Sequence, residues 1–192
     1  MTPFSDIYAA AVKHKGSEKA LQELLGKSAK KAALKKLDDA EVLAEMTRCV
    51  FRSGFVWKII EAKWPGFESA FHDFDVTRCA MLSDEELEVL SENTEIVRHA
   101  KKIASVRANA QYILTIRESH GSFGRYLHDW PADDFVGLWL DLKKRGSRLG
   151  GQTGRFFLRF IGFDTPCSRG MLWRRWSKPG LSRKNPPVRK RF

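Results

Sequence analysis

The sequence has few cysteines and lacks the motifs that hold metals or nucleotides. Its three cysteines, Cys49, Cys79 and Cys167, are odd in number and widely spaced, which favours reduced thiols in a cytoplasmic protein over a disulfide framework. There is no CxxC pair, no HxxxH spacing, no GxSxG elbow and no GxxxxGK[ST] loop. We therefore expect neither a metal site nor a cofactor.

Long apolar runs are also lacking. No stretch approaches the ~20 consecutive apolar residues that a membrane-spanning helix requires. The N-terminus, Met1 to Tyr8, contains Asp6 and lacks a basic region followed by an apolar one. We expect no membrane partner and no secretion signal.

Acidic residues are missing from the end of the chain. Residues 166–192 contain nine Lys and Arg and no Asp or Glu, whereas the preceding residues contain 25 Lys and Arg against 23 Asp and Glu. The net charge of +11 therefore belongs to this tail and indicates little about the folded part. We expect either an irregular basic tail, which would bind nucleic acid non-specifically, or the product of a reading-frame shift.

Helical patterns fill the rest of the sequence. Asp38 with Glu41, and Ser83 with Glu86, have the spacing of a capping box at a helix start. Apolar residues recur at helical spacing in several windows, and none alternates as a strand would. The windows are 17–25, 42–50, 55–64, 103–121, 133–144 and 155–161. We expect Pro65 and Gly66 to end the helix of the window 55–64. The sequence predicts an all-α fold, with a helical extension over 1–37, one helical domain over 38–165 and the tail over 166–192.

A glycine-rich turn lies between two of these helices, at about residues 146–154. A helix ends on the basic run Lys143-Lys144-Arg145, and another begins near Thr153 after Arg148, Gly150 and Gly151, with Gly154 close behind. Glycines permit close approach of a ligand, and the free N–H groups of a helix start attract anions. The turn is a candidate phosphate grip on DNA, and the alternative is a plain connection between helices.

Two further segments could contact nucleic acid. Phe55 and Trp57 follow Gly54 and could stack on an extruded base, although core packing is the commoner fate of such residues. Arg98, His99 and Lys101 lie at a predicted helix start, where positive charge is disfavoured unless an anion compensates it. That anion is a DNA phosphate or a nearby glutamate.

Taken in order, these segments resemble the 3-methyladenine DNA glycosylase I family from about Asp38 to Asp164. The resemblance rests on residues 54–57, 70–75, 96–103, 109–110, 145–151 and Gly162. It implies a helix-hairpin-helix DNA glycosylase fold and an enzyme that flips N3-methylated adenine out of duplex DNA and hydrolyses its glycosidic bond in base-excision repair. Trp57 matches the stacking tryptophan of the family, and Gly150, Gly151 and Thr153 match its hairpin.

The sequence also departs from that family. Cys49 stands at the position of the family's base-recognising glutamate, eight residues before Trp57, and the family's zinc ligands are not found. Related glycosylases have an aspartate about twenty residues past the hairpin glycine, where this chain has Gly170 and Met171. Asp164 is the nearest carboxylate and our candidate catalytic residue.

Three hypotheses follow. The first is a monomeric DNA N-glycosylase acting on alkylated adenine, with Cys49, Phe55 and Trp57 around the flipped base. The second is a DNA-binding protein of the same fold with impaired catalysis, which Cys49 and the missing aspartate past the hairpin favour. The third is a helical interaction module in which Trp57 belongs to the core and the glycine-rich turn only connects helices.

Overall fold

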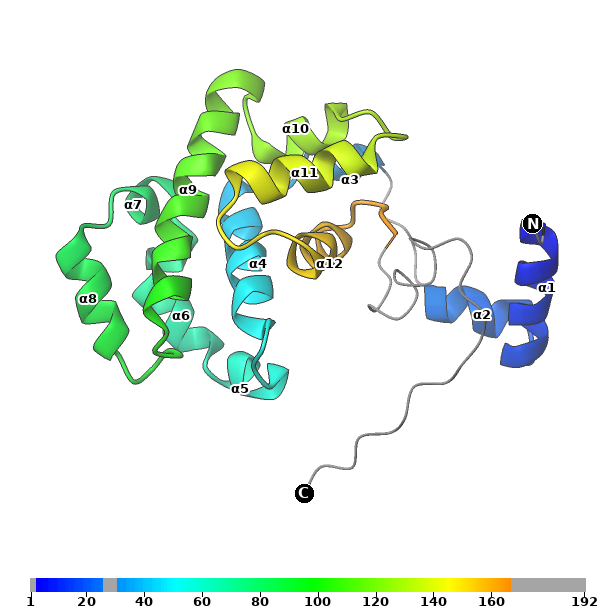
Figure 1. Cartoon of the computed structure of the whole chain (residues 1–192), viewed down its shortest axis with the longest axis horizontal. Coiled ribbons are helices and arrows are strands. Elements are labelled where there is room, and N and C mark those ends of the chain that lie inside the picture. The colour runs from blue at the N-terminus through cyan, green and yellow to red at the C-terminus, as the bar shows by residue number, and fades with distance from the viewer. Residues whose placement is uncertain (1–2, 26–30, 167–192) are drawn as a thin grey trace, which may run out of the picture.

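The computed structural model describes residues 3–25 and 31–166, and every regular element within these ranges is a helix (Figure 1). The elements are α1 (Phe4–Lys15), α2 (Glu18–Leu25), α3 (Lys31–Leu34), α4 (Asp39–Arg52), α5 (Trp57–Ala62), α6 (Trp64–Ala70), the 3-10 helix η1 (His72–Phe74), α7 (Val76–Ala80), α8 (Asp84–Glu92), α9 (Ala100–His120), α10 (Phe123–Asp129), α11 (Phe135–Arg145) and α12 (Gln152–Phe160). The predicted all-α class is confirmed. The interpretations of the 167–192 tail lie outside the described residues.

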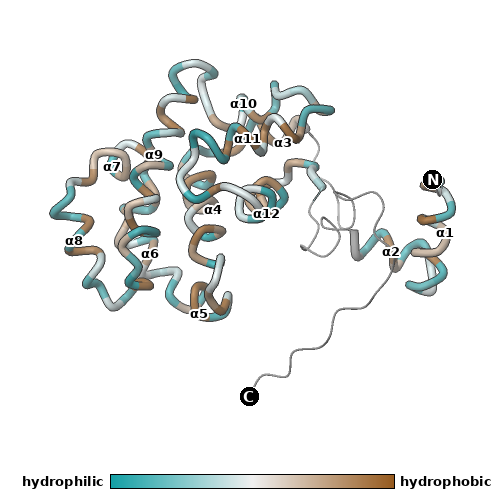
Figure 2. The backbone as a smooth tube through the Cα atoms, in the orientation of Figure 1, coloured by the Kyte–Doolittle hydropathy of each residue, from teal (hydrophilic) through white to brown (hydrophobic). Residues whose placement is uncertain are grey.

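The longest helix, α9, forms the centre of the body. It packs against α7 and α8 on one side and against α4 and α10 on another, while α12 packs on α4 (Figure 1). Hydrophobic and hydrophilic residues alternate along the helices (Figure 2). The apolar residues of α4 and α12, among them Val42, Met46 and Phe157, are buried in the core. The core is rich in phenylalanine, with Phe51, Phe67, Phe71, Phe123 and Phe157 fully buried.

Local sequence signals explain where several helices begin. The Ser83 hydroxyl accepts a hydrogen bond from the Glu86 amide (3.1 Å), and the Glu86 carboxylate accepts one from the Ser83 amide (2.7 Å). This is the predicted capping box, and α8 begins directly after it. Asp38 caps α4 by accepting from the amide of Ala40 (3.4 Å).

The prediction that Pro65 and Gly66 end a helix is wrong. Both lie inside the first turn of α6, where proline is tolerated because the N–H that it lacks would have no helical partner. Gly66 has a packing role, because a Cβ at this position would collide with the backbone carbonyl of Glu95. The break between α5 and α6 falls at Lys63 instead, because α5 ends at Ala62 and α6 begins at Trp64.

The first two helices form a small unit of their own. They pack against each other, and across their interface the Tyr8 hydroxyl donates a hydrogen bond to Glu18 (3.0 Å) and accepts one from Gln22 (2.9 Å). No helix in residues 3–25 or 31–166 is long and apolar enough to cross a bilayer.

Candidate functional site

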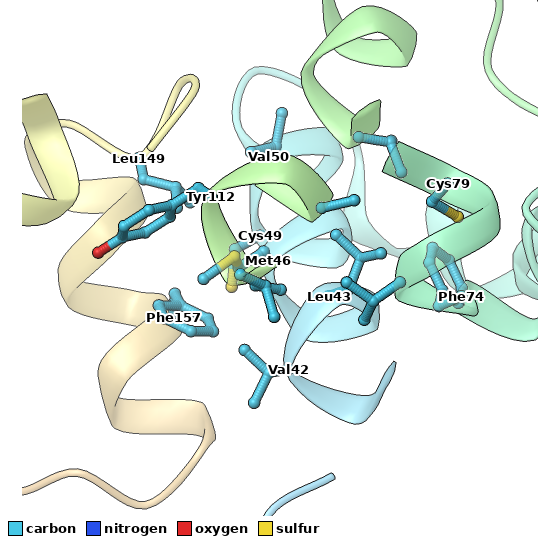
Figure 3. Close-up of a cluster of buried hydrophobic side chains, with 14 of the residues drawn as sticks. Val42, Leu43, Met46, Cys49, Val50, Phe74, Cys79, Tyr112, Leu149 and Phe157 are labelled. Atoms are coloured by element: carbon cyan, nitrogen blue, oxygen red, sulfur yellow. The ribbon is translucent and has the colours of Figure 1, made fainter. Parts of the chain in front are cut away.

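A cavity of about 170 Å³ opens where the end of α4, the start of α5 and one face of α12 meet. The contact between α4 and α12 is close, with Met46 and Cys49 directed toward Phe157 (Figure 3). The residues that line the cavity are Cys49, Arg52, Ser53, Trp57, Gln152, Thr153, Phe156 and Phe160. A cavity of ~150 Å³ is large enough to hold one aromatic ring.

Trp57 forms an aromatic wall of this cavity. Its indole is 46% exposed, and it meets Phe156 and Phe160 edge-on at ring-centroid distances of 6.3 and 6.2 Å. Gly54, with φ of +84°, turns the chain out of α4 so that α5 begins at Trp57. Trp57 is therefore not a core residue, which removes one of the two premises of the third hypothesis.

Phe55 lies outside the lining of this cavity. Its ring is 37% exposed, stands 4.5 Å from the Lys102 Nζ and meets the His99 ring edge-on at 6.3 Å. It borders the side of the loop that faces α9 rather than α12.

Cys49 lies in the cavity wall as a neutral thiol. It is 4% exposed, and its Sγ donates to the Oε1 of Glu45 at 3.4 Å. Burial, followed by the nearby Glu45 carboxylate, raises the pKa of the thiol above its usual range. The position expected to carry a carboxylate thus carries no charge at neutral pH.

Arg52 is a lining residue that sequence analysis did not single out. Its guanidinium Cζ lies 5.0 Å from the centroid of Trp57 and 5.4 Å from that of Phe160. Its spacing of three residues from Cys49 would have revealed it, because residues i and i+3 share one face of a helix.

The glycine-rich turn has the geometry of a tight hairpin between α11 and α12. Arg148 and Gly151 both adopt positive φ, of +61° and +63°. A Cβ on Gly154 would collide with the Leu149 carbonyl, so only glycine allows the turn to lie directly on α12. Thr153, predicted near the helix start, lies in the first turn of α12.

A buried amide fixes this turn to the central helix. The side chain of Asn109 on α9 donates to the carbonyl of Ser147 (3.2 Å) and accepts from its amide (2.7 Å). Asn109 is fully buried, so these two bonds are shielded from water. The turn is therefore held in one position by α9.

A second cavity, of about 360 Å³, lies beside the first. Its lining residues are Val50, Ser53, Lys102, Arg148, Gly150 and Thr153. The Lys102 Nζ donates to the carbonyls of Ser53 (2.6 Å) and Phe51 (3.2 Å) at the end of α4. Burial, followed by the positive charge of Arg148, lowers the pKa of Lys102 to about 8.

The three basic residues before the hairpin, Lys143, Lys144 and Arg145, differ in their surroundings. Arg145 is held by Asp141, with Nε–Oδ1 at 2.8 Å and Nη2–Oδ2 at 2.9 Å, and Asp141 also accepts from the hydroxyls of Tyr112 and Tyr126, both at 2.7 Å. This cluster braces α11 against α9 and α10. Lys143 and Lys144 are exposed.

The remaining candidate residues lie apart from the Trp57 cavity. Arg98 and Lys101 are exposed at the start of α9, and His99 is half-buried as its N-cap residue. Asp164 is exposed after α12 and lines neither cavity. Across residues 3–25 and 31–166, no group of three or more His, Cys, Asp or Glu side chains could hold a metal ion.

Solved structures that are similar to this one include 3-methyladenine DNA glycosylases I. A 3-methyladenine DNA glycosylase I in complex with 3-methyladenine matches with a TM-score of 0.59 and 26% identity, over 66% of this chain and 78% of the other. The 3-methyladenine DNA glycosylase I of Staphylococcus aureus matches with a TM-score of 0.58 and 26% identity, over 66% of this chain and 77% of the other.

Sequence comparison leads to the same group of proteins. DNA-3-methyladenine glycosylase 1 of Escherichia coli (strain K12) is 28% identical over 72 residues, which is 38% of this chain and 38% of the length of that relative. Residues 31–137, more than half of the chain, match the model of the methyladenine glycosylase family. The chain therefore belongs to the methyladenine glycosylase family.

Proposed function

We propose that this protein is a DNA N-glycosylase that flips a damaged base, in the first instance 3-methyladenine, out of duplex DNA and hydrolyses its glycosidic bond. The observation that carries the proposal is the half-exposed Trp57 in the wall of an open cavity of about 170 Å³. Arg148 and Gly150 of the hairpin line the second cavity, which shares Ser53 and Thr153 with the first. Base and backbone contacts would therefore be made side by side.

The residues divide the work as follows. The amides at the start of α12 and the side chain of Arg148 bind a phosphate, with Arg98, His99 and Lys101 along the DNA face. Trp57 stacks on the flipped base. N3-alkylation places a positive charge on adenine and so weakens the glycosidic bond, and the protein has only to hold the extruded nucleotide and admit water. The protein acts as a monomer without a cofactor.

The test is release of free 3-methyladenine from methylated duplex DNA. We expect release by the wild-type protein and a loss of at least tenfold in the Trp57→Ala variant. Equal release by both proteins, or none by either, would contradict a glycosylase that uses this cavity.

A second function, damage-dependent DNA binding without catalysis, is favoured by Cys49 and Asp164. The first is a neutral thiol where a carboxylate is expected, and the second is exposed and lines neither cavity. Under this function, a duplex with a damaged base would bind more tightly than an undamaged one, and no base would be released. Introducing a carboxylate by Cys49→Glu would then create release, whereas it would change little in an active enzyme.

A further inference from the structure

Helix α5, which carries Trp57 into the cavity wall, has few anchors of its own. It is six residues long, and among its residues Ile60 alone is buried. No side chain caps its N-terminus, and the chain reaches it through Gly54, where an added Cβ would meet nothing within 4 Å. Because a helix this short is not stable on its own, contacts with neighbouring elements must fix it and its tryptophan.

One face of α5 is attached to α4 by ion pairs. Trp57 and Glu61 are four residues apart and therefore share that face. The Oε1 of Glu61 accepts from the Nε (3.0 Å) and the Nη2 (2.8 Å) of Arg52, and its Oε2 lies 3.9 Å from the Nε of Arg48. The Cζ of the same Arg52 lies 5.0 Å from the centroid of the Trp57 ring. A single guanidinium thus contacts both members of the α5 face.

The cluster around this guanidinium is balanced in charge. Glu45 on α4 faces both arginines, with 3.2 Å to the Nη1 of Arg48 and 3.6 Å to the Nη1 of Arg52. Two carboxylates compensate two guanidinium groups, so the cluster is compatible with a cationic base in the cavity. Its contribution is geometric, because a planar guanidinium binds a carboxylate at its edge and stacks on an aromatic ring with its face.

We propose that Glu61 is a positioning residue, which acts through Arg52 to hold the indole of Trp57 in the wall of the base cavity. The inference rests on the proposed function in one respect, that Trp57 stacks on a base flipped from DNA. Because the Glu61 side chain is 46% exposed, its pairing with Arg52 is screened by salt. The placement of the tryptophan should therefore depend on ionic strength.

Binding of the full chain to two duplexes tests the inference without requiring turnover. One duplex carries a single 3-deaza-3-methyladenine, an uncharged analogue of the alkylated base with a stable glycosidic bond, and the other is undamaged. The ratio of the two affinities isolates the base contact, because phosphate contacts are common to both duplexes. We expect Glu61→Gln to lower this ratio by about three- to tenfold, as a partial loss of base stacking would. Added salt should lower the ratio in the wild-type protein and leave it unchanged in Glu61→Gln.

Two further measurements separate positioning from general stabilisation. The emission of Trp57 is obtained as the difference between each protein and its Trp57→Phe counterpart, and it should shift in Glu61→Gln because the indole loses its fixed cation. Arg52→Gln should also lower the affinity ratio. The double variant should lose no more than the larger of the two single losses, because both residues act through one contact.

Glu68→Gln is the matched control. Glu68 is an exposed carboxylate on α6 and does not line the cavity. This variant removes the same charge as Glu61→Gln, so it measures the general gain in DNA affinity that follows the loss of a negative charge. It should keep the wild-type affinity ratio and the wild-type emission of Trp57.

The outcomes separate the inference from the proposed function. A Glu61-dependent ratio without base release supports the inference and contradicts glycosylase activity. Base release with the same ratio in wild type and Glu61→Gln contradicts the inference alone, and a wild-type ratio of one contradicts both. A parallel loss of affinity for the two duplexes, additive losses in the double variant, or an equal fall of the ratio in Glu68→Gln would overturn the inference.

Discussion

Arg48 and Arg52 lie one helical turn apart on α4, and each lies over a tryptophan, Trp64 in one case and Trp57 in the other. The two tryptophans differ in burial. Arg48 lies 3.9 Å from the Trp64 centroid, and Trp64 is 8% exposed and stacked on Phe67 and Phe74. Trp57, beside Arg52, is 46% exposed at the cavity. The same contact chemistry thus serves packing in one place and a binding wall in the other, and exposure distinguishes them.

The largest effect should be the loss of stability when the buried tryptophan, Trp64, is removed. We expect Trp64→Ala to lower the free energy of unfolding by about 3–5 kcal/mol, because it removes a large ring from a packed aromatic cluster. Denaturant unfolding measures this. Trp57→Ala is the matched control and should cost less than about 1 kcal/mol. A similar loss in both variants would abolish the distinction between the two tryptophans.

The next largest effect should be a loss of DNA affinity when the exposed tryptophan, Trp57, is removed. Trp57→Ala should weaken binding to a duplex with a damaged base by about 10- to 100-fold, because stacking of one base contributes ~1–3 kcal/mol. Binding to undamaged duplex should change little. Fluorescence anisotropy with matched duplexes gives both affinities, and a uniform loss on both would place Trp57 on the general DNA surface instead.

A third prediction concerns the hairpin, and its variant leaves both tryptophans intact. Arg148→Gln in the hairpin should weaken binding to damaged and undamaged duplexes by the same factor of a few, and should reduce the salt dependence of log affinity by about one phosphate contact. Titrations at several salt concentrations measure this. Unchanged affinity and slope would support a turn that only connects helices.

The smallest effect concerns Lys102, whose Nζ donates to the carbonyls of Phe51 and Ser53 at the end of α4. Its pKa is about 8 in the folded protein against an ordinary 10.5, so between these values the unfolded chain binds more protons. The stability of the wild-type protein should therefore rise between pH 8 and 10.5 relative to Lys102→Met. Unfolding experiments across this pH range measure the difference, and Lys101→Met, at an exposed neighbour on α9, is the matched control for the loss of one lysine.

Sequence patterns predicted the helices and the hairpin well because both depend on local signals. The Ser83 capping box and the tight turn at Gly151 and Gly154 follow from backbone requirements that neighbouring residues express. Pro65 misled the prediction, because the same residue that ends a helix also fits its first turn.

The cavity was only partly predictable. Trp57 was identified, but its exposure depends on how α12 packs on α4, which no local pattern expresses. The charge of Arg52 inside the cavity, and the attachment of the turn by Asn109 from 38 residues earlier, both require the tertiary fold. The acceptors of Lys102 are carbonyls of a distant helix, so its role was equally hidden.

Ser53 and Thr153 line both cavities, and this shared wall couples the two halves of the site. Substitutions on either side of it would not combine additively, because each would move a surface that the other cavity uses. A variant selected to bind a new base would therefore also change its affinity for the DNA backbone. Double-mutant cycles across positions 53 and 153 would measure the coupling energy between base specificity and general DNA affinity.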